Sequence, residues 1–394
     1  MEHILKIGAM ADDRRCIVVG AGLLGLAAAW ALSRRGWAVR VFEAAGSVGH
    51  ARSGSKGDAR IFRLGYPEPL YVEMAILSEA LWHDLEATSG RTLLHTTGQV
   101  SFGDDTALSA IATALSAHER VTQDLTTGDV IRRFPGFATH GPALFEPDSG
   151  VLAADACLTA FRDTSHFELQ TGHPVTAFRQ SSESVVVTTA AGSEFEADVV
   201  VDCAGPRTLA LLGHGLPASA AAGPSVPQVA YFRAVEPGAA ARLPVFIEWG
   251  PDMVYGLPVL GTGPHAGSYK VSHHSPGTPL DRFDPLDATA WGDERALLAR
   301  LNEAVRHFLP ALNPEPAATE RCVYDNSVDQ DFVIDRIGNV VVGCGTSGHA
   351  FKFGPLIGEM LADLAEDHRP PVDVTRFRLD RGAATGAGSV AANR

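Results

Sequence analysis

The sequence has little cysteine and no long apolar run. Five of the 394 residues are cysteines, at positions 16, 157, 203, 322 and 344, an odd number without a CxxC pair. This scatter argues against a disulfide framework and against a cysteine-bound metal, so no metal is expected. No stretch reaches about 18 apolar residues, and Asp12 and Asp13 precede the first apolar run, unlike a secretory signal. We therefore expect a soluble, cytoplasmic protein.

Positive charge is also scarce. There are 32 Lys and Arg against 46 Asp and Glu, a formal net charge of -14. Such a chain repels phosphate backbones and anionic lipids, so neither nucleic acid nor a membrane is expected as a partner. With 45% hydrophobic residues, a chain of this length can bury two cores, which predicts two domains. The oligomeric state stays open, a monomer included.

A glycine-rich turn follows the first apolar run. Residues 16–19 lead into Gly20-Ala21-Gly22-Leu23-Leu24-Gly25, then into a helix-compatible stretch at 26–35 and an apolar run at 38–42 that ends in Glu43. This order of strand, glycine turn, helix, strand and acid is typical of a dinucleotide-binding unit.

Each residue of this motif has a physical task. Gly20 permits the tight turn, Gly22 lets the backbone approach a pyrophosphate, and Gly25 lets the helix pack on its strand. The first helical amides, at Leu23 and Leu24, face the phosphates. Glu43 is placed to accept hydrogen bonds from a ribose diol and disfavours the extra phosphate of NADP. The motif itself leaves FAD and NAD open.

Three further segments carry polar residues in a distinctive order. They are the loop Gly54-Ser55-Lys56-Gly57-Asp58-Ala59-Arg60-Ile61-Phe62-Arg63, the strands that bear Tyr255-Gly256-Leu257-Pro258, Lys270 and His274, and the C-terminal stretch with Cys322 and Gly345-Thr346-Ser347-Gly348-His349-Ala350-Phe351-Lys352. Taken alone, these residues have ordinary structural explanations, as solvated arginines, an edge tyrosine, a strand lysine, a turn histidine and an unremarkable thiol.

Together these motifs resemble the family of monomeric sarcosine oxidase and N-methyltryptophan oxidase, FAD-dependent amine oxidoreductases of the D-amino-acid oxidase superfamily. The resemblance covers about residues 14 to 380. It implies that Ser55 and Arg60 lie along the flavin and that Arg63 and Lys352 bind the substrate carboxylate. It also implies that Tyr255 and His274 line the cavity and that Lys270 activates oxygen, where a cation favours superoxide as it forms.

The same resemblance assigns the cofactor contacts near the C-terminus. Cys322 falls on the cysteine that bonds covalently to the flavin 8α-methyl group in that family. Gly345 and Gly348, with His349 and Lys352 beside them, would let backbone amides approach the flavin pyrimidine edge, where charge accumulates on reduction. FAD, covalently held at Cys322, is therefore the expected cofactor.

The chain departs from the family at several positions. Lys56 stands where relatives often carry His, and Phe62 and Leu64 alter the lining of the loop. Trp249, Met253 and Val254 near the presumed cavity are expected to allow an N-substituent larger than methyl.

The predicted fold is α/β, with a Rossmann-like, discontinuous FAD-binding domain (1–90, 150–215 and 320–385) and a second, antiparallel-sheet substrate-binding domain (91–149 and 216–319). The tail from 382, with 386–394 outside both domains, is expected to be disordered. The expected function is oxidation of the C–N bond of a small N-substituted amino acid by O2. A dehydrogenase with another electron acceptor and a non-catalytic flavin-binding module are the alternatives.

Overall fold

The first sheet of the computed structural model has six strands in the order β10-β3-β2-β14-β24-β23. The structure describes residues 5–6, 14–213, 223–274, 277–280, 283–284, 287, 291 and 294–381. The first five strands of this sheet run parallel, and only β23 is antiparallel to its neighbour. The strands are β2 (Arg15–Val19), β3 (Ala38–Glu43), β10 (Phe167–Thr171), β14 (Val199–Asp202), β23 (Val333–Ile337) and β24 (Val340–Cys344).

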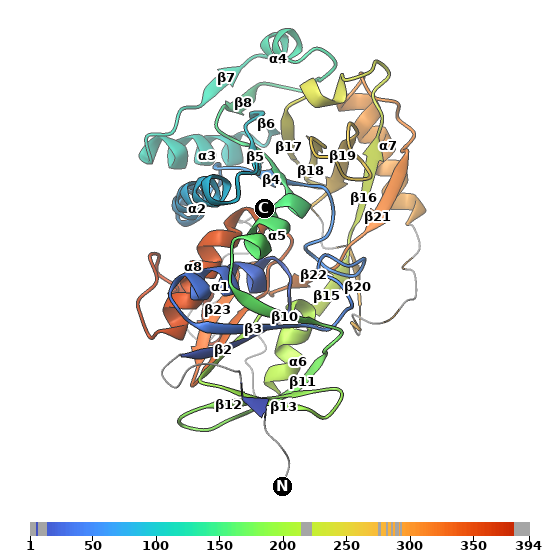
Figure 1. The fold of residues 1–394 in the computed structure, drawn as a ribbon. Helices are drawn as coiled ribbons and strands as arrows, with labels where there is room; N and C mark the ends of the chain where they lie inside the picture. Colours follow the sequence, from blue (N-terminus) through green and yellow to red (C-terminus); the bar gives the residue numbers. More distant parts are fainter. Residues whose placement is uncertain are drawn as a thin grey trace.

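Alternating side chains of this sheet enter two different cores. In β2, Val18 packs with helices α1 (Leu23–Arg34) and α8 (Gly354–Ala365), whereas Ile17 and Val19 pack against a smaller sheet. This is the two-residue period of a strand that is buried on both faces. Figure 1 shows the resulting layers, with α1 and α8 on one side and the smaller sheet below. The smaller sheet contains β1 (Leu5–Lys6), β11 (Val175–Gln180), β12 (Val185–Thr189) and β13 (Glu194–Ala197).

A second large sheet of eight strands, in the order β21-β16-β19-β18-β17-β6-β8-β7, lies above the first. Neighbouring strands of this sheet are antiparallel, as expected, except for the parallel pair β6 and β17. Its strands are β6 (Gln99–Gly103), β7 (Gln123–Leu125), β8 (Ala143–Glu146), β16 (Gln228–Phe232), β17 (Val245–Trp249), β18 (Val254–Pro258), β19 (Tyr269–His273) and β21 (Ala318–Arg321).

One face of this second sheet carries an aromatic core, and the other face roofs a cavity. Phe102, Phe246 and Tyr269 pack on the first face against helix α7 (Arg295–Phe308). Successive side chains of β18 point to opposite faces of the sheet. Val254 packs in the aromatic core, and the next residue, Tyr255, lines the cavity. The expectation that Val254 lies near the cavity was therefore wrong.

The remaining elements connect the two large sheets. Two three-stranded sheets, β4-β9-β5 and β20-β15-β22, lie between them. Their strands are β4 (Ala59–Phe62), β5 (Leu94–His95), β9 (Gly150–Ala153), β15 (Gly223–Val226), β20 (Thr278–Pro279) and β22 (Tyr324–Asn326). The other helices are α2 (Pro69–Ser89), α3 (Asp105–Ala117), α4 (Thr127–Arg133), α5 (Ala154–Asp163) and α6 (Thr208–Leu212).

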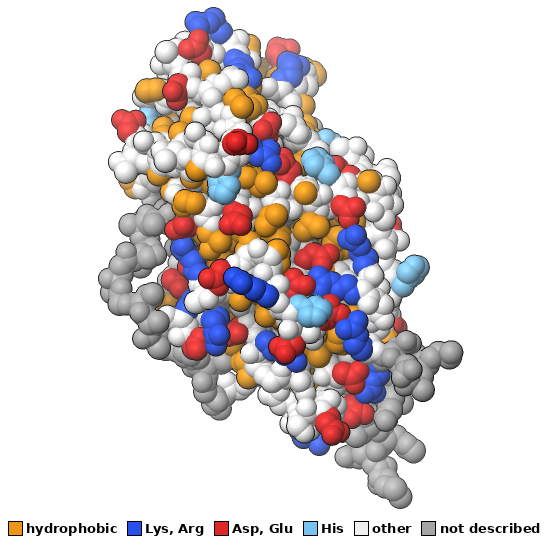
Figure 2. Space-filling view, turned by 90° about the vertical axis from the view of Figure 1, so that its left-hand side faces the viewer, with side chains coloured by type: hydrophobic (Ala, Val, Ile, Leu, Met, Phe, Trp, Pro, Cys, Tyr) orange, Lys and Arg blue, Asp and Glu red, His pale blue; other side chains and the backbone are white. Residues whose placement is uncertain are grey.

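The α/β fold class is confirmed by these sheets. The predicted domain boundaries stay a prediction, although the first large sheet takes its strands from 15–43, 167–202 and 333–344, as that division expects. The tail predicted to be disordered falls outside the described residues. Across the described chain, every helix is too short or too polar to cross a membrane. On the face in Figure 2, acidic and basic side chains are intermixed around a central group of apolar ones.

Candidate active site

A cavity of about 240 Å³ opens at the carboxyl ends of the parallel strands, beneath the eight-stranded sheet. This edge is where open α/β sheets bind their ligands. Its walls come from the beginning, the middle and the end of the chain. The predicted site residues that line it are Gly20, Gly22, Leu23, Leu24, Glu43, Ser55, Arg60, Arg63, Tyr255, Lys270, His274, Cys322, Gly348, His349 and Lys352.

The glycine turn has the geometry of a pyrophosphate cradle. Gly20 has φ +96°, and a Cβ there would lie 2.5 Å from the Cys203 carbonyl oxygen. A Cβ on Gly25 would lie 1.9 Å from the Gly20 carbonyl oxygen, so Gly25 serves the packing of the helix on the turn and does not line the cavity. Gly22 is the N-cap of α1, and Leu23 and Leu24 in the first turn of that helix line the cavity. The turn fits the diphosphate of a dinucleotide.

Glu43 ends β3 at the rim of this cradle. Its carboxylate is buried and accepts hydrogen bonds from the amides of Ala21 and Ala45, each at 2.9 Å. These bonds fix the carboxylate in place and leave lone pairs on both oxygens, which suits a ribose diol. The cradle and the acid together fit the ADP portion of FAD.

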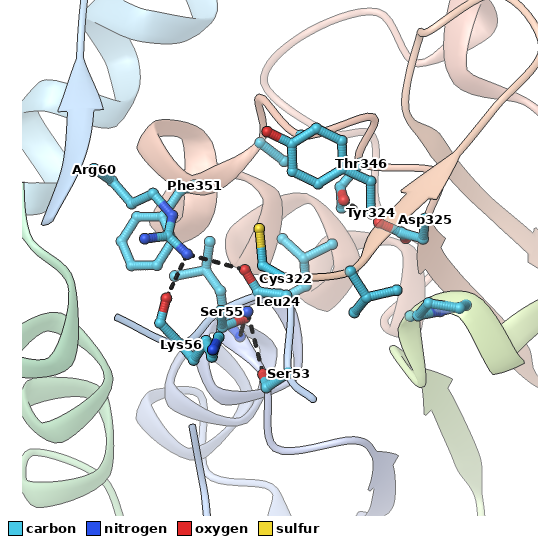
Figure 3. Close-up of a pocket in the computed structure, with 18 of the residues that line it drawn as sticks. Leu24, Ser53, Ser55, Lys56, Arg60, Cys322, Tyr324, Asp325, Thr346 and Phe351 are labelled. Carbon is cyan, nitrogen blue, oxygen red and sulfur yellow. Dashed lines mark hydrogen bonds between the residues drawn. The ribbon is translucent and has the colours of Figure 1, made fainter. Parts of the chain in front are cut away.

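The loop between β3 and β4 closes one side of the cavity. Ser55 Oγ accepts a hydrogen bond from the Leu23 amide at 2.9 Å, which ties the loop to the start of α1. Arg60 donates to the carbonyl oxygens of Gly54 at 3.1 Å and Lys56 at 2.5 Å, and its guanidinium lies 5.4 Å from the Phe351 ring centroid. Figure 3 shows this arrangement. Arg60 thus shapes the loop with its own side chain.

Cys322 projects into the same space. Its sulfur lies between Arg60 and Phe351 on one side and Tyr324 on the other (Figure 3). The thiol is half-buried, whereas the other four cysteines are buried, and burial raises the pKa of each of those thiols. The position of Cys322 is compatible with a sulfur that reaches a bound flavin.

Arg63 and Lys352 converge on the opposite wall. Both side chains are 5% exposed. Lys352 Nζ donates to Tyr66 Oη at 2.8 Å and to the His349 carbonyl oxygen at 2.7 Å. The Arg63 guanidinium lies 4.0 Å from the Tyr66 ring centroid, and its Nη1 is a buried donor without a hydrogen-bond partner. A carboxylate between the two cations would supply the missing acceptor.

Lys270 enters the cavity from β19. It is 5% exposed, and its Nζ donates to the Ala59 carbonyl oxygen at 3.3 Å. Burial, together with the positive charge of Arg60, lowers the pKa of Lys270 to about 7. A buried ammonium held by one long hydrogen bond can turn toward a charge that develops beside it.

Tyr255 and His274 complete the roof of the cavity. Burial raises the pKa of Tyr255, whose phenol interacts with the Tyr324 phenol and with the Ser272 hydroxyl. The His274 ring lies 6.4 Å from the His349 ring in an edge-to-face arrangement. These side chains give the substrate end both aromatic surface and polar groups.

The C-terminal glycine loop uses its two glycines differently. Gly348, with φ +77°, lines the cavity, and a Cβ there would lie 2.3 Å from the Tyr324 ring. Gly345, with φ +65°, lies behind the cavity wall against Val333. Asp325 holds this loop, since its carboxylate accepts from the Thr346 hydroxyl. Gly345 therefore shapes the loop, and Gly348 forms the surface.

Sequence reasoning missed two tyrosines in the cavity region. Tyr66 bonds Lys352, which is remote in sequence, so no local pattern points to that contact. Tyr324 could have been found, because it follows Cys322 by two residues, and alternate residues of an extended chain share a face. Of the residues expected to widen the cavity, Met253 lines it, and Trp249 packs 5.3 Å from Arg63.

The fold and this site define a dinucleotide-dependent oxidoreductase, and comparison with known proteins gives the class. Residues 15–364 match the family model DAO, "FAD dependent oxidoreductase". The chain belongs to this family. It is 31% identical to the human peroxisomal sarcosine oxidase, over 96% of this chain and 99% of that protein.

Two further relatives narrow the class. The chain is 30% identical to N-methyl-L-tryptophan oxidase of Yersinia pestis (strain Pestoides F), over 94% of this chain and 99% of that protein. The solved structure of NikD, an unusual amino acid oxidase essential for nikkomycin biosynthesis, is 28% identical with a TM-score of 0.76, over 93% of this chain and 97% of that one. The expected family is confirmed, as is the enzyme class, an FAD-dependent amine or amino acid oxidase.

Proposed function

We propose that this enzyme oxidises the C–N bond of a small N-substituted amino acid, with an N-alkyl, cyclic or N-carboxymethyl group, and uses O2 as the electron acceptor. The observation that carries the proposal is the buried, unpartnered Nη1 of Arg63 beside Lys352. Two cations in an otherwise apolar, aromatic wall favour one carboxylate strongly over a neutral group.

The chain's own residues would orient the substrate and exclude water. Arg63 offers a planar fork and Lys352 a point charge, so together they fix the carboxylate and with it the neighbouring carbon. Bound FAD would accept a hydride equivalent, two electrons and one proton, from the carbon next to the neutral amine, leaving a protonated imine that water hydrolyses. Reoxidation of the flavin by O2 would yield hydrogen peroxide. Lys270 would stabilise negative charge on oxygen.

The flavin is proposed to be covalently attached through Cys322. The half-buried Cys322 thiol, which lies in the cavity close to the loop between β3 and β4, supports this attachment. Acid precipitation tests it directly, because covalent flavin stays in the pellet and free FAD enters the supernatant. Cys322→Ser should release the colour, whereas Cys157→Ser, a buried cysteine of α5 away from the cavity, should leave it bound. Free FAD in the wild-type supernatant would contradict the covalent link alone.

The reaction itself is tested with a panel of N-methyl, cyclic and N-carboxymethyl amino acids. Anaerobic bleaching of the flavin absorbance identifies substrates, and peroxide formation in air identifies the acceptor. Substrates bulkier than sarcosine should be turned over faster, because Met253 is an unbranched, adaptable side chain on the cavity wall. Bleaching without peroxide would indicate a dehydrogenase, and no bleaching by any amino acid would refute the proposed reaction.

A further inference from the structure

The carboxylate clamp contains two buried cations and no carboxylate of its own. Within the described part of the chain, neither Arg63 nor Lys352 forms an ion pair with an acidic side chain. Two like charges that share a dry site repel each other, and each loses its hydration. An empty clamp therefore needs a source of negative charge from somewhere else in the wall.

The acidic side chains nearest this wall are engaged by other groups. Glu146 accepts from the Gly65 amide and Gln99 Nε2, both at 2.9 Å, and from Ser149 Oγ at 3.0 Å. Asp331 accepts from Tyr71 Oη at 2.8 Å and from Arg376 Nε at 2.7 Å. Burial raises the pKa of Glu146, and the positive charge of Arg63 opposes that rise, so Glu146 interacts with Arg63 at a distance. Neither carboxylate is hydrogen-bonded to Arg63 or Lys352 within the described part of the chain.

Tyr66 is the acidic group that touches both cations. Its phenol oxygen accepts from Lys352 Nζ at 2.8 Å, and the Arg63 guanidinium lies 4.0 Å from its ring centroid. Tyr71 stacks on its other side at 5.2 Å, and the His349 ring lies 6.3 Å away. Tyr66 itself is 2% exposed. Its titratable surroundings are thus Arg63, Lys352, Tyr71 and His349.

We propose that Tyr66 is the resident counter-ion of the clamp: its phenol ionises between Lys352 and Arg63 when no carboxylate is bound, and takes up one proton when a carboxylate binds. Tyr66 would therefore be a positioning residue that keeps both cations charged and in place until substrate arrives. The inference rests on the proposed function, because it takes the clamp to be the carboxylate site.

The other tyrosines make this ionisation observable. The chain has 6 tyrosines. The positive charges of Lys352 and Arg63 lower the pKa of Tyr66 despite its burial. Burial raises the pKa of the remaining five, Tyr71, Tyr231, Tyr255, Tyr269 and Tyr324. A tyrosinate signal that appears below the ordinary tyrosine pKa of about 10 would thus come from a single residue.

The experiment uses the flavin-loaded enzyme and methoxyacetate, which replaces the amine of sarcosine with an ether oxygen and cannot lose a proton. At about pH 9, one unit below the ordinary tyrosine pKa, binding is followed by the flavin spectrum, proton uptake by calorimetry in two buffers, and tyrosinate by absorbance in the near ultraviolet. We expect the wild type to take up about one proton and to lose its tyrosinate band, in line with linkage.

Two variants sharpen the outcome. Tyr66→Phe should bind methoxyacetate without proton uptake and without a tyrosinate band. Tyr269→Phe is the matched control, because Tyr269 is also buried but bonds the Pro244 carbonyl oxygen on the far face of the sheet; it should behave as the wild type does. Binding without proton uptake in the wild type, or equal uptake in Tyr66→Phe, would overturn the role of Tyr66. Failure of methoxyacetate to bind at all would instead refute the clamp, and the inference with it.

Discussion

Lys270 and Lys352 are both buried lysines of one cavity, yet the chain holds them in opposite ways. Lys352 has two short hydrogen bonds, to Tyr66 Oη and to the His349 carbonyl oxygen. Lys270 has one long contact, to the Ala59 carbonyl oxygen at 3.3 Å. Each side chain is 5% exposed, and burial lowers the pKa of both. Burial alone therefore does not distinguish them.

The difference lies in what each ammonium can still do. Lys352 is fixed by geometry, which suits a group that must present its charge in one place to a carboxylate. Lys270 is loosely held, and its pKa of about 7 lets it be either charged or neutral near physiological pH. A group of that kind can respond to charge that appears during a reaction. The comparison predicts that Lys352 governs substrate binding and that Lys270 governs the reaction of the reduced flavin with oxygen.

The largest effect is expected for Lys270→Met. This change removes the ammonium and keeps the length of the side chain. Reaction of the reduced enzyme with oxygen should slow by about 100- to 1,000-fold, the usual loss when one preorganised charge is removed, while anaerobic reduction by substrate is retained. Stopped-flow measurement of the two half-reactions checks this. Lys56→Met, which removes another lysine of the cavity wall, should have a much smaller effect. Equal loss in both half-reactions would contradict the assignment.

A smaller and different effect is expected for Lys352→Met. Loss of one charged hydrogen bond to the substrate costs about 1.5–3 kcal/mol, which weakens binding about ten- to a hundredfold. The oxygen half-reaction should change little, because Lys270 is untouched. The test compares KM for the best amino acid substrate with the second-order constant for oxygen. A variant that binds substrate normally but reoxidises slowly would reverse the roles of the two lysines.

The pH dependence of reoxidation should follow Lys270. Because its pKa is lowered to about 7, the ammonium is present below that pH and is lost as the pH rises through it. The rate of reoxidation should therefore fall above about pH 7, with a midpoint that Lys270→Met abolishes. Stopped-flow oxidation of substrate-free, reduced enzyme across a pH series measures this directly. A flat profile in the wild type would show that the charge of Lys270 does not control the step.

Local sequence predicts one part of this site well. Gly20, Gly22, Gly25 and Glu43 belong to a single strand-turn-helix-strand unit, so their spacing alone specifies the cradle. Gly25 illustrates this best, since the close approach of its backbone to the Gly20 carbonyl follows from the tight turn. The α/β class follows from the same local patterns.

The substrate end could not be derived in this way. Arg63 and Lys352 line one cavity but are far apart in the sequence, separated by strands of both large sheets. From its local sequence, each of them would be predicted to be a solvated cation. The resemblance to the family predicted Arg63 and Lys352 as the carboxylate site. It did not predict Tyr66, whose proposed role depends on its hydrogen bond with Lys352. Val254 was misplaced because strand β18 turns alternate side chains to opposite faces, and the pattern did not show which set faces the cavity.

The smallest predicted effect concerns the acid that faces Lys270. Adjacent pairing in β21, β16 and β19 places Glu320, Tyr231 and Lys270 along one face, and Glu320 accepts from Tyr231 Oη at 3.1 Å. The negative charge of Glu320 raises the pKa of Lys270 against the effects of burial and Arg60.

Glu320→Gln should therefore shift the midpoint of the reoxidation profile downward by about half to one pH unit, the size expected for one charge at moderate distance in a partly screened site. Glu315→Gln removes an exposed carboxylate paired with Arg306 and should leave the midpoint in place. No shift, or an equal shift in both variants, would mean that Glu320 does not influence the pKa of Lys270. Lys270 and Lys352 would then differ only in their hydrogen bonds, and the acid on β21 would have a purely structural role.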